Sequence, residues 1–208
     1  MNSSSEIKVV LFDLGRVLMH IDFEAFPNGL GLFTKEQRAP YDAPLKPFIR
    51  LYEEGKMTTE EFLDGLYAIF DCRFPHEQLL EAFNGIIVED NAAIIRFVEE
   101  VKKKYHIAVL SNTCECHWKK VENISSILRM FPPENIFTSF GIGVMKPDRK
   151  IYDAVCASLH VRSEEILFID DLPENVRGAV DAGMRGIIFR DVEHLQTDFL
   201  DILKEKIT

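Results

Sequence analysis

Short apolar runs alternate with longer amphipathic segments over most of this chain. The first run, VVLF at 9–12, stops abruptly at Asp13. Runs of this length, bounded by polar or glycine positions, are typical of strands buried in a sheet. Five segments fit this pattern: VVLF at 9–12, HIAVLS at 106–111, NIFTS at 135–139, EEILFIDD at 164–171 and RGIIF at 185–189.

Amphipathic segments with a helical repeat lie between these runs in the C-terminal half. Strands that alternate with helices predict an α/β fold with a Rossmann-like, doubly wound parallel sheet covered on both faces. Pro173 suits the first turn of one helix, and Asp90 or Asn91 is expected to cap another. The predicted helices occupy 90–105, 148–160, 173–184 and 192–205.

The span from 22 to 90 has a different pattern, without a buried strand. Thr58 followed by Glu61 is a capping-box signature at the start of one helical segment. Two further helical patterns cover 45–55 and 76–86. We therefore predict a helical subdomain at 22–90, inserted after the first strand into a core formed by 1–21 and 91–208.

Charge and composition narrow the function. The 208 residues carry a net charge of −10 without a basic block, which argues against a nucleic-acid partner. No apolar run reaches membrane-spanning length, and the polar start MNSSSE lacks the features of a signal peptide. Four cysteines in such a chain favour a reduced, cytoplasmic protein. The cluster CECH at 114–117 lacks a second ligand pair, so we expect a helix start there and not a zinc site.

Polar residues end three of the predicted strands: Asp13, Ser111 and the pair Asp170–Asp171. In open parallel sheets, ligands bind at the carboxyl ends of the strands. Lys146, which follows a short strand, adds an ammonium to the same edge. Each residue alone is compatible with ordinary helix capping, but together they suit phosphoryl transfer. Carboxylates bind Mg²⁺ or attack phosphorus, and a lysine and a hydroxyl bind phosphoryl oxygens.

Four segments, in order, resemble the motifs of the haloacid dehalogenase superfamily. They are VLFDLGRVL, VLSNT, MKPDRKIY and FIDDLPEN, and the resemblance extends over essentially the whole chain. The chain is most similar to the subgroup that contains bacterial α-D-glucose-1-phosphate phosphatase and the phosphatase domain of soluble epoxide hydrolase. The helical insertion matches the family's mobile cap.

The resemblance implies a role for each matching residue. Asp13 would be the nucleophile. Ser111 would bind the phosphate, together with the backbone N–H of Asn112, and Lys146 would pair with both the nucleophile and the phosphate.

The resemblance also implies a magnesium site. Asp13, the backbone carbonyl of Gly15 and Asp171 would be the ligands of Mg²⁺. Asp170 and Asn175 would lie beside them and support the site.

Position 15 departs from the usual family pattern. Most phosphatases of the superfamily have there a second aspartate that acts as general acid and base, whereas this chain has Gly15. Without an acid, the rate should depend steeply on leaving-group acidity. Aryl phosphates, acyl phosphates and sugar 1-phosphates should then be hydrolysed faster than sugar 6-phosphates and alkyl phosphates. Asp22 and His20 are candidate replacements, although a plain surface or cap-hinge position is the simpler interpretation for both.

These observations predict a Mg²⁺-dependent phosphatase that hydrolyses a small phosphorylated metabolite, such as a sugar phosphate, through an aspartyl-phosphate. Two alternatives remain open at this point. One is a metal-independent 2-haloacid dehalogenase, in which Asp13 attacks carbon. The other is a non-catalytic phosphate-binding protein. The sequence does not indicate an oligomeric state.

Overall fold

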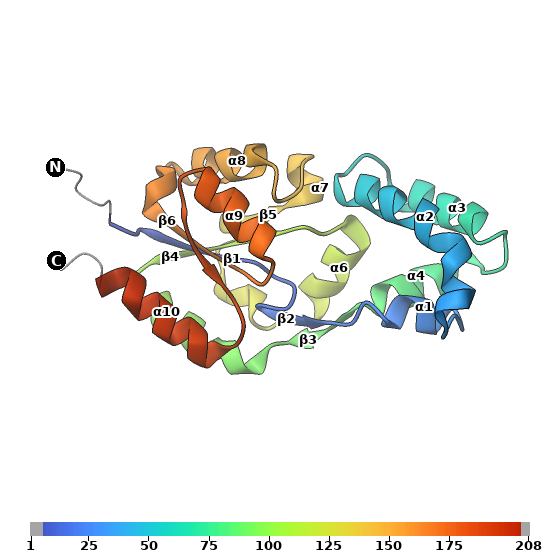
Figure 1. The fold of residues 1–208 in the computed structure, drawn as a ribbon, viewed down its shortest axis with the longest axis horizontal. Helices are drawn as coiled ribbons and strands as arrows, with labels where there is room; N and C mark the ends of the chain where they lie inside the picture. Colours follow the sequence, from blue (N-terminus) through green and yellow to red (C-terminus); the bar gives the residue numbers. More distant parts are fainter. Residues whose placement is uncertain (1–5, 205–208) are drawn as a thin grey trace.

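A five-stranded parallel sheet forms the centre of the protein, seen in the computed structural model, which describes residues 6–204 (Figure 1). The strand order is β5-β4-β1-β6-β7. This confirms the predicted α/β fold and each of the five predicted strands. The strands are β1 (Val9–Phe12), β4 (His106–Ser111), β5 (Ile136–Thr138), β6 (Ile166–Asp170) and β7 (Arg185–Ile188).

The central strand β1 pairs with β4 on one side and with β6 on the other. In this register Phe12 lies opposite Val109 and Ile169. The residues that follow these three therefore emerge at the same edge of the sheet. This edge receives Asp13, Ser111 and Asp170, and it lies where the chain order reverses across β1.

Helices cover both faces of the sheet (Figure 1). Val10 and Phe12 of β1 pack towards α5 and α10, whereas Val9 and Leu11 pack towards α8 and α9. All four side chains are buried, as expected for a strand at the centre of a two-sided sheet. The helices of this region are α5 (Ile95–Val101), α6 (Glu115–Ile124), α7 (Ser139–Ile142), α8 (Arg149–Leu159), α9 (Pro173–Asp181) and α10 (Val192–Lys204).

Four helices between β1 and β4 form a separate lobe, which we call the cap (Figure 1). They are α1 (Ala25–Gly29), α2 (Lys35–Glu53), α3 (Thr59–Ile69) and α4 (His76–Asn84). The cap has its own aromatic core, in which the rings of Tyr52 and Phe62 stack at 4.2 Å and Phe83 lies 4.9 Å from Phe62. An antiparallel ribbon of β2 (Met19–Ile21) and β3 (Ile87–Asp90) connects the cap to the core.

The structure confirms some of the local predictions for the cap and corrects others. The Thr58–Glu61 capping box is present, with both reciprocal hydrogen bonds. Helix α2 begins earlier than predicted, after a second capping box at Thr34. Its three internal prolines, Pro40, Pro44 and Pro47, lie on the exposed side, where water can satisfy the carbonyls that lose an amide partner.

The end of the insertion also differs from the prediction. Residues 87–90 form β3, so the span predicted to lack strands ends in one. Asp90 does not cap the following helix, because its carboxylate accepts hydrogen bonds from Ser125, Ser126 and Ile127. Asn91 instead donates from its side chain to the carbonyl of Val17, 74 residues away. Long-range contacts thus replace the local caps.

Candidate active site

Asp13 lies one residue beyond the end of β1. Its backbone amide donates to the carbonyl of Ile169 at 2.8 Å, which keeps the residue in line with the sheet. Its Oδ1 accepts a hydrogen bond from Lys146 Nζ at 2.5 Å. Burial raises the pKa of Asp13, and the Lys146 ammonium opposes that rise. A buried carboxylate in this position requires positive charge beside it.

The ammonium of Lys146 contacts two carboxylates of the site. Besides Asp13, Nζ contacts Asp170 Oδ2 at 2.7 Å and the Leu110 carbonyl at 2.9 Å, so all three of its protons are used. Burial alone would lower the pKa of Lys146. The two carboxylates outweigh burial and raise the pKa, so the ammonium stays charged.

Asn112 positions Lys146 through its side chain. Its Oδ1 accepts from the Lys146 amide at 2.9 Å, and its Nδ2 donates to the Lys146 carbonyl at 3.0 Å. This pair of bonds connects the end of β4 to the segment before α8. Ser111, the last residue of β4, is buried, and its hydroxyl has no hydrogen-bond partner among the described residues. That hydroxyl therefore remains available to an oxyanion.

Asp170 has no free oxygen. Asn175 Nδ2 contacts Oδ1 and Oδ2, both at 3.1 Å, and the Leu172 amide donates to Oδ1 at 2.8 Å. With Lys146 on Oδ2 as well, this fully buried carboxylate is held from three directions. Its surroundings fit a residue that fixes the lysine and the start of α9.

Asp171, the next residue, is only half-buried, and its nearest cation is Arg16, at 3.7 Å from Oδ2. Oxygens of Asp13, Asp170 and Asp171 lie within 4.8 Å of one another. Because Asp170 is fully engaged, the oxygens available to a metal belong to Asp13 and Asp171. The Lys146 ammonium and the more distant Arg16 guanidinium do not balance three carboxylates, and the excess negative charge with hard oxygen donors fits Mg²⁺.

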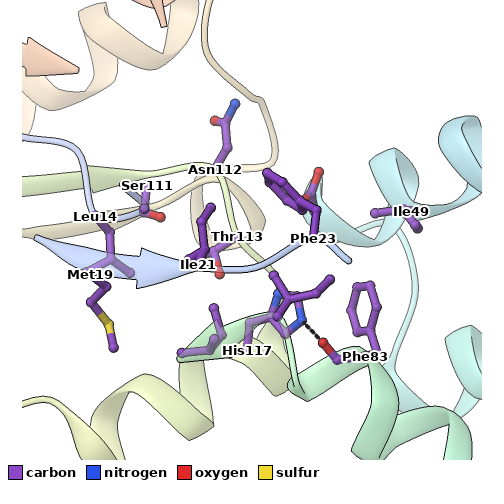
Figure 2. A pocket seen from close by; sticks show the side chains of 14 residues that line it. Leu14, Met19, Ile21, Phe23, Ile49, Phe83, Ser111, Asn112, Thr113 and His117 are labelled. Carbon is purple, nitrogen blue, oxygen red and sulfur yellow. Dashed lines mark hydrogen bonds between the residues drawn. The ribbon is translucent and has the colours of Figure 1, made fainter. Parts of the chain in front are cut away.

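A pocket of about 150 Å³ opens between this cluster and the cap. Figure 2 shows Ser111 and Asn112 on the core side, with Ile49 and Phe83 of the cap across from them. Most of the wall is apolar, and it includes Leu14, Met19, Ile21, Phe23, Ile86 and Ile87. Typical small-molecule sites occupy roughly 300–1,000 Å³, so this space accepts a small group.

Gly15 also lines the pocket. A Cβ added there would lie 3.1 Å from Cδ1 of Ile21, closer than ordinary contact. Ile21 therefore occupies part of the space that an aspartate side chain at position 15 would need.

The two candidate replacements for the missing acid lie away from the pocket. Asp22 is exposed, and its Oδ1 accepts from the Glu24 amide at 2.9 Å, at the entrance to the cap. His20 is exposed on β2. Neither lines the pocket in the part of the chain that the structure describes. Their exposed positions support the interpretation as surface or hinge residues.

The cluster at 114–117 forms the start of α6, as predicted, with Cys114 at the N-cap. Folding brings ligand atoms of Cys114, Cys116 and His117 within 4.8 Å of one another, and the two sulfurs lie 3.7 Å apart. The His117 ring stacks on Phe83 at 4.2 Å, and its Nε2 is bonded to the Phe83 carbonyl at 2.9 Å. These contacts fit a packed junction between the core and the cap.

Sequence reasoning missed one residue of the pocket, Glu53. It is the last residue of α2, in a segment predicted to be helical, and it brings a carboxyl to the apolar wall. The adjacent Glu53 and Glu54 look alike in the sequence, so no local pattern distinguishes the residue that reaches the site.

Curated and solved relatives resemble the chain over most of its length. D-ribitol-5-phosphate phosphatase of Bacteroides thetaiotaomicron is 27% identical over 179 residues, which cover 82% of this chain and 85% of that protein. Bifunctional epoxide hydrolase 2 of Rattus norvegicus is 36% identical, but only over 27% of this chain and 10% of its own.

A HAD family enzyme of Bacteroides thetaiotaomicron is structurally similar, with a TM-score of 0.81, 26% identity and coverage of 92% of this chain and 98% of that chain. Its complex with magnesium and inorganic phosphate matches with a TM-score of 0.77, 27% identity and coverage of 91% and 98%. The family model for haloacid dehalogenase-like hydrolases matches residues 7–183. With its parallel core, helical cap and strand-end cluster, the chain belongs to the haloacid dehalogenase-like hydrolases.

Proposed function

We propose that the chain is a Mg²⁺-dependent phosphatase that hydrolyses small phosphorylated metabolites through an aspartyl-phosphate on Asp13. One observation carries the proposal: Lys146 engages one oxygen of Asp13 and leaves the other free, and the Ser111 hydroxyl, at the same edge of the sheet, has no hydrogen-bond partner among the described residues. A nucleophile, an ammonium and a hydroxyl in this arrangement suit attack on a phosphoryl group.

Asp13 and Asp171 would hold the Mg²⁺ ion, with the Gly15 carbonyl as a further ligand. The bound ion would neutralise charge on the phosphoryl oxygens. Lys146 would favour the ionised form of Asp13 and would exchange one of its present acceptors for a phosphoryl oxygen, while Ser111 and the backbone N–H of Asn112 would bind the others. Asp170 and Asn175 keep the lysine in place. In the first step an oxygen of Asp13 bonds to phosphorus and the ester oxygen leaves; in the second, water releases phosphate.

The pocket and the relatives both support this substrate class. A site of about 150 Å³ beside the phosphate-binding groups fits the leaving group of a small phosphomonoester. One relative is named for a phosphorylated sugar alcohol, and a similar structure contains magnesium and inorganic phosphate. Residues 22–90 would form the substrate-selecting cap of a cytoplasmic enzyme.

A panel of phosphate esters tests the proposal directly. Phosphate release should require Mg²⁺ and should stop when the metal is chelated. The panel should include aryl phosphates, acetyl phosphate, sugar 1- and 6-phosphates and ribitol 5-phosphate, with 2-chloropropionate as a non-phosphate control. Halide release without metal would favour the dehalogenase alternative, and binding of phosphate without turnover of any ester would favour a non-catalytic role.

A further inference from the structure

The glycine at position 15 leaves the departing ester oxygen without a proton donor on the core side. A donor must lie in the pocket beside the phosphate-binding groups. Among the described residues that line it, Glu53 and His117 have titratable side chains. The two side chains differ in whether they already form hydrogen bonds within the protein.

His117 is a poor donor because it is committed to the cap. Its Nε2 is bonded to the Phe83 carbonyl, and its ring is stacked on the Phe83 ring (Figure 2). Burial lowers the pKa of His117 to about 4, so the ring is neutral at pH 7. A neutral imidazole that is held in this way has no acidic proton to deliver.

Glu53 has the opposite character. Its carboxyl is half-buried against the apolar wall and forms no hydrogen bond or ion pair with any residue the structure describes. Its neighbour Glu54 is, by contrast, paired with Arg50 at 2.8 Å. Burial raises the pKa of Glu53 to about 7. A carboxylic acid of this kind keeps a substantial protonated fraction at neutral pH.

The backbone at Glu53 is fixed against the phosphate-binding loop. Ser139 Oγ donates to the Glu53 carbonyl at 2.7 Å and accepts from the Thr113 amide at 2.9 Å. Thr113 lies two residues after Ser111. Gly55, in the left-handed region at φ +67°, packs so closely on the core that an added Cβ would lie 2.3 Å from the Phe140 carbonyl oxygen. The end of α2 is thus seated on the core.

We propose that Glu53 is the general acid and base of the reaction, replacing from the cap the side chain that Gly15 lacks. As the Asp13 oxygen bonds to phosphorus and the bond to the ester oxygen breaks, Glu53 gives that oxygen its proton, so an alcohol leaves. The Glu53 carboxylate then takes a proton from the water that attacks phosphorus, and the Asp13–phosphorus bond breaks. Phosphate leaves, with Asp13 ionised and Glu53 protonated again. This inference rests on the proposed phosphatase function.

The other charged and titratable groups near the end of α2 leave this assignment unchanged. The Cys114 thiol is buried, and its pKa is raised, by burial first and to a smaller extent by Glu53, so it is neutral. Glu115 is bonded to Thr59 at 2.6 Å and to Lys119 at 2.7 Å. Lys56 donates to the Gly143 carbonyl at 3.3 Å. None of them forms an ion pair with Glu53 among the described residues.

The test compares leaving groups in wild-type protein and in Glu53→Gln, which keeps the shape but loses the proton. Loss of general acid catalysis should reduce kcat/KM, which reports the steps up to release of the leaving group, by about 10²–10⁴-fold for an alkyl ester such as ribitol 5-phosphate. The kcat/KM for acetyl phosphate, whose leaving group needs no proton, should change by less than about threefold. The rate of Glu53→Gln should then depend steeply on leaving-group acidity, as expected from Gly15 alone. The rate of wild-type protein should depend on it only weakly.

Glu54→Gln is the matched control, and it should leave every ester unchanged because Glu54 is paired outside the pocket. An equal loss of kcat/KM on all esters in Glu53→Gln, or no loss on any, would overturn the role of Glu53 as the acid, because kcat/KM excludes the later attack of water, which is the same for every ester. If the role of Glu53 is overturned but phosphatase activity still requires Asp13, the proposed function is retained. Loss of the Asp13 requirement would instead remove the proposed function itself.

Two further readouts do not depend on the variant's activity. In wild-type protein, turnover of the alkyl ester should fall as pH rises through about 7, the pKa of Glu53. Release of acetate from acetyl phosphate should not fall over the same pH range. The pKa of Glu53 is raised in the folded protein. Its ionisation therefore lowers the free energy of unfolding as the pH rises from the usual pKa of a glutamate to about 7. The Tm of Glu53→Gln relative to that of wild type should therefore rise as the pH increases from 5 to 8. A constant difference in Tm would mean that Glu53 is ionised throughout.

Discussion

The two sides of the active site are built on different principles. On the core side, each charged group is held by others: Lys146 by Asp13 and Asp170, and Asp170 by Asn175. On the cap side, the wall is apolar, and its one carboxyl, Glu53, has no hydrogen-bond partner among the described residues. The first arrangement keeps charges fixed, and the second raises the pKa of a carboxyl, so that a substantial fraction of it is protonated near neutral pH.

This contrast separates two tasks of a phosphatase. Binding and attacking a phosphoryl group requires permanent charges in fixed positions, which ends of adjacent strands provide. Transferring a proton requires a group whose pKa lies near the working pH, which burial provides for a carboxyl.

Removing the nucleophile should have the largest effect. Asp13→Asn should lower activity by more than about 10³-fold, because an amide does not attack phosphorus. The fold should persist, since Lys146 keeps Asp170 as a partner. Steady-state assays with Asp22→Asn as an exposed control measure this effect. Activity above about a tenth of wild type would contradict covalent catalysis by Asp13.

The adjacent acids Asp170 and Asp171 should respond differently. Asp171→Ala should raise the Mg²⁺ concentration needed for half-maximal activity at least about tenfold, with little change in Tm. Asp170→Asn breaks a fully buried ion pair and should cost about 3–5 kcal/mol of unfolding free energy. Magnesium titrations and denaturant melts on both variants test this. An unchanged metal requirement in Asp171→Ala would place the ion elsewhere.

Gly15→Asp should have a smaller effect, and it tests whether an acid on the core side can replace Glu53. The new Cβ meets Ile21 Cδ1 at 3.1 Å, so overpacking should cost about 1–3 kcal/mol of unfolding free energy. Adding Ile21→Val should recover part of that loss. In the Glu53→Gln background, the new carboxyl should restore some turnover of alkyl esters. Restored turnover in Gly15→Ala would show that space, and not an acid, limits the reaction.

The core was readable from the sequence because its signals are local. Buried strands appear as short apolar runs, and parallel pairing then brings Asp13, Ser111 and Asp170 to one edge. The Thr58–Glu61 capping box was readable for the same reason. Roles of the site residues, and the cap boundaries at 22 and 90, stay predictions.

Features that depend on long-range contacts were not readable. Asp90 looks like a helix cap but binds a loop 35–37 residues away. Glu53 and Glu54 occupy equivalent positions in the sequence, and only the seating of α2 on the core decides which carboxyl faces the pocket. Proline normally ends a helix, so the early start of α2 was hidden as well.

The most direct test of the central claim is to trap the phosphorylated enzyme. Protein mixed with Mg²⁺ and acetyl phosphate is quenched in acid within one turnover, digested and examined by mass spectrometry. The account predicts one phosphoryl group on the peptide that contains Asp13, and none in Asp13→Asn. A phosphoryl group on another residue, or turnover without any phosphorylated peptide, would contradict it.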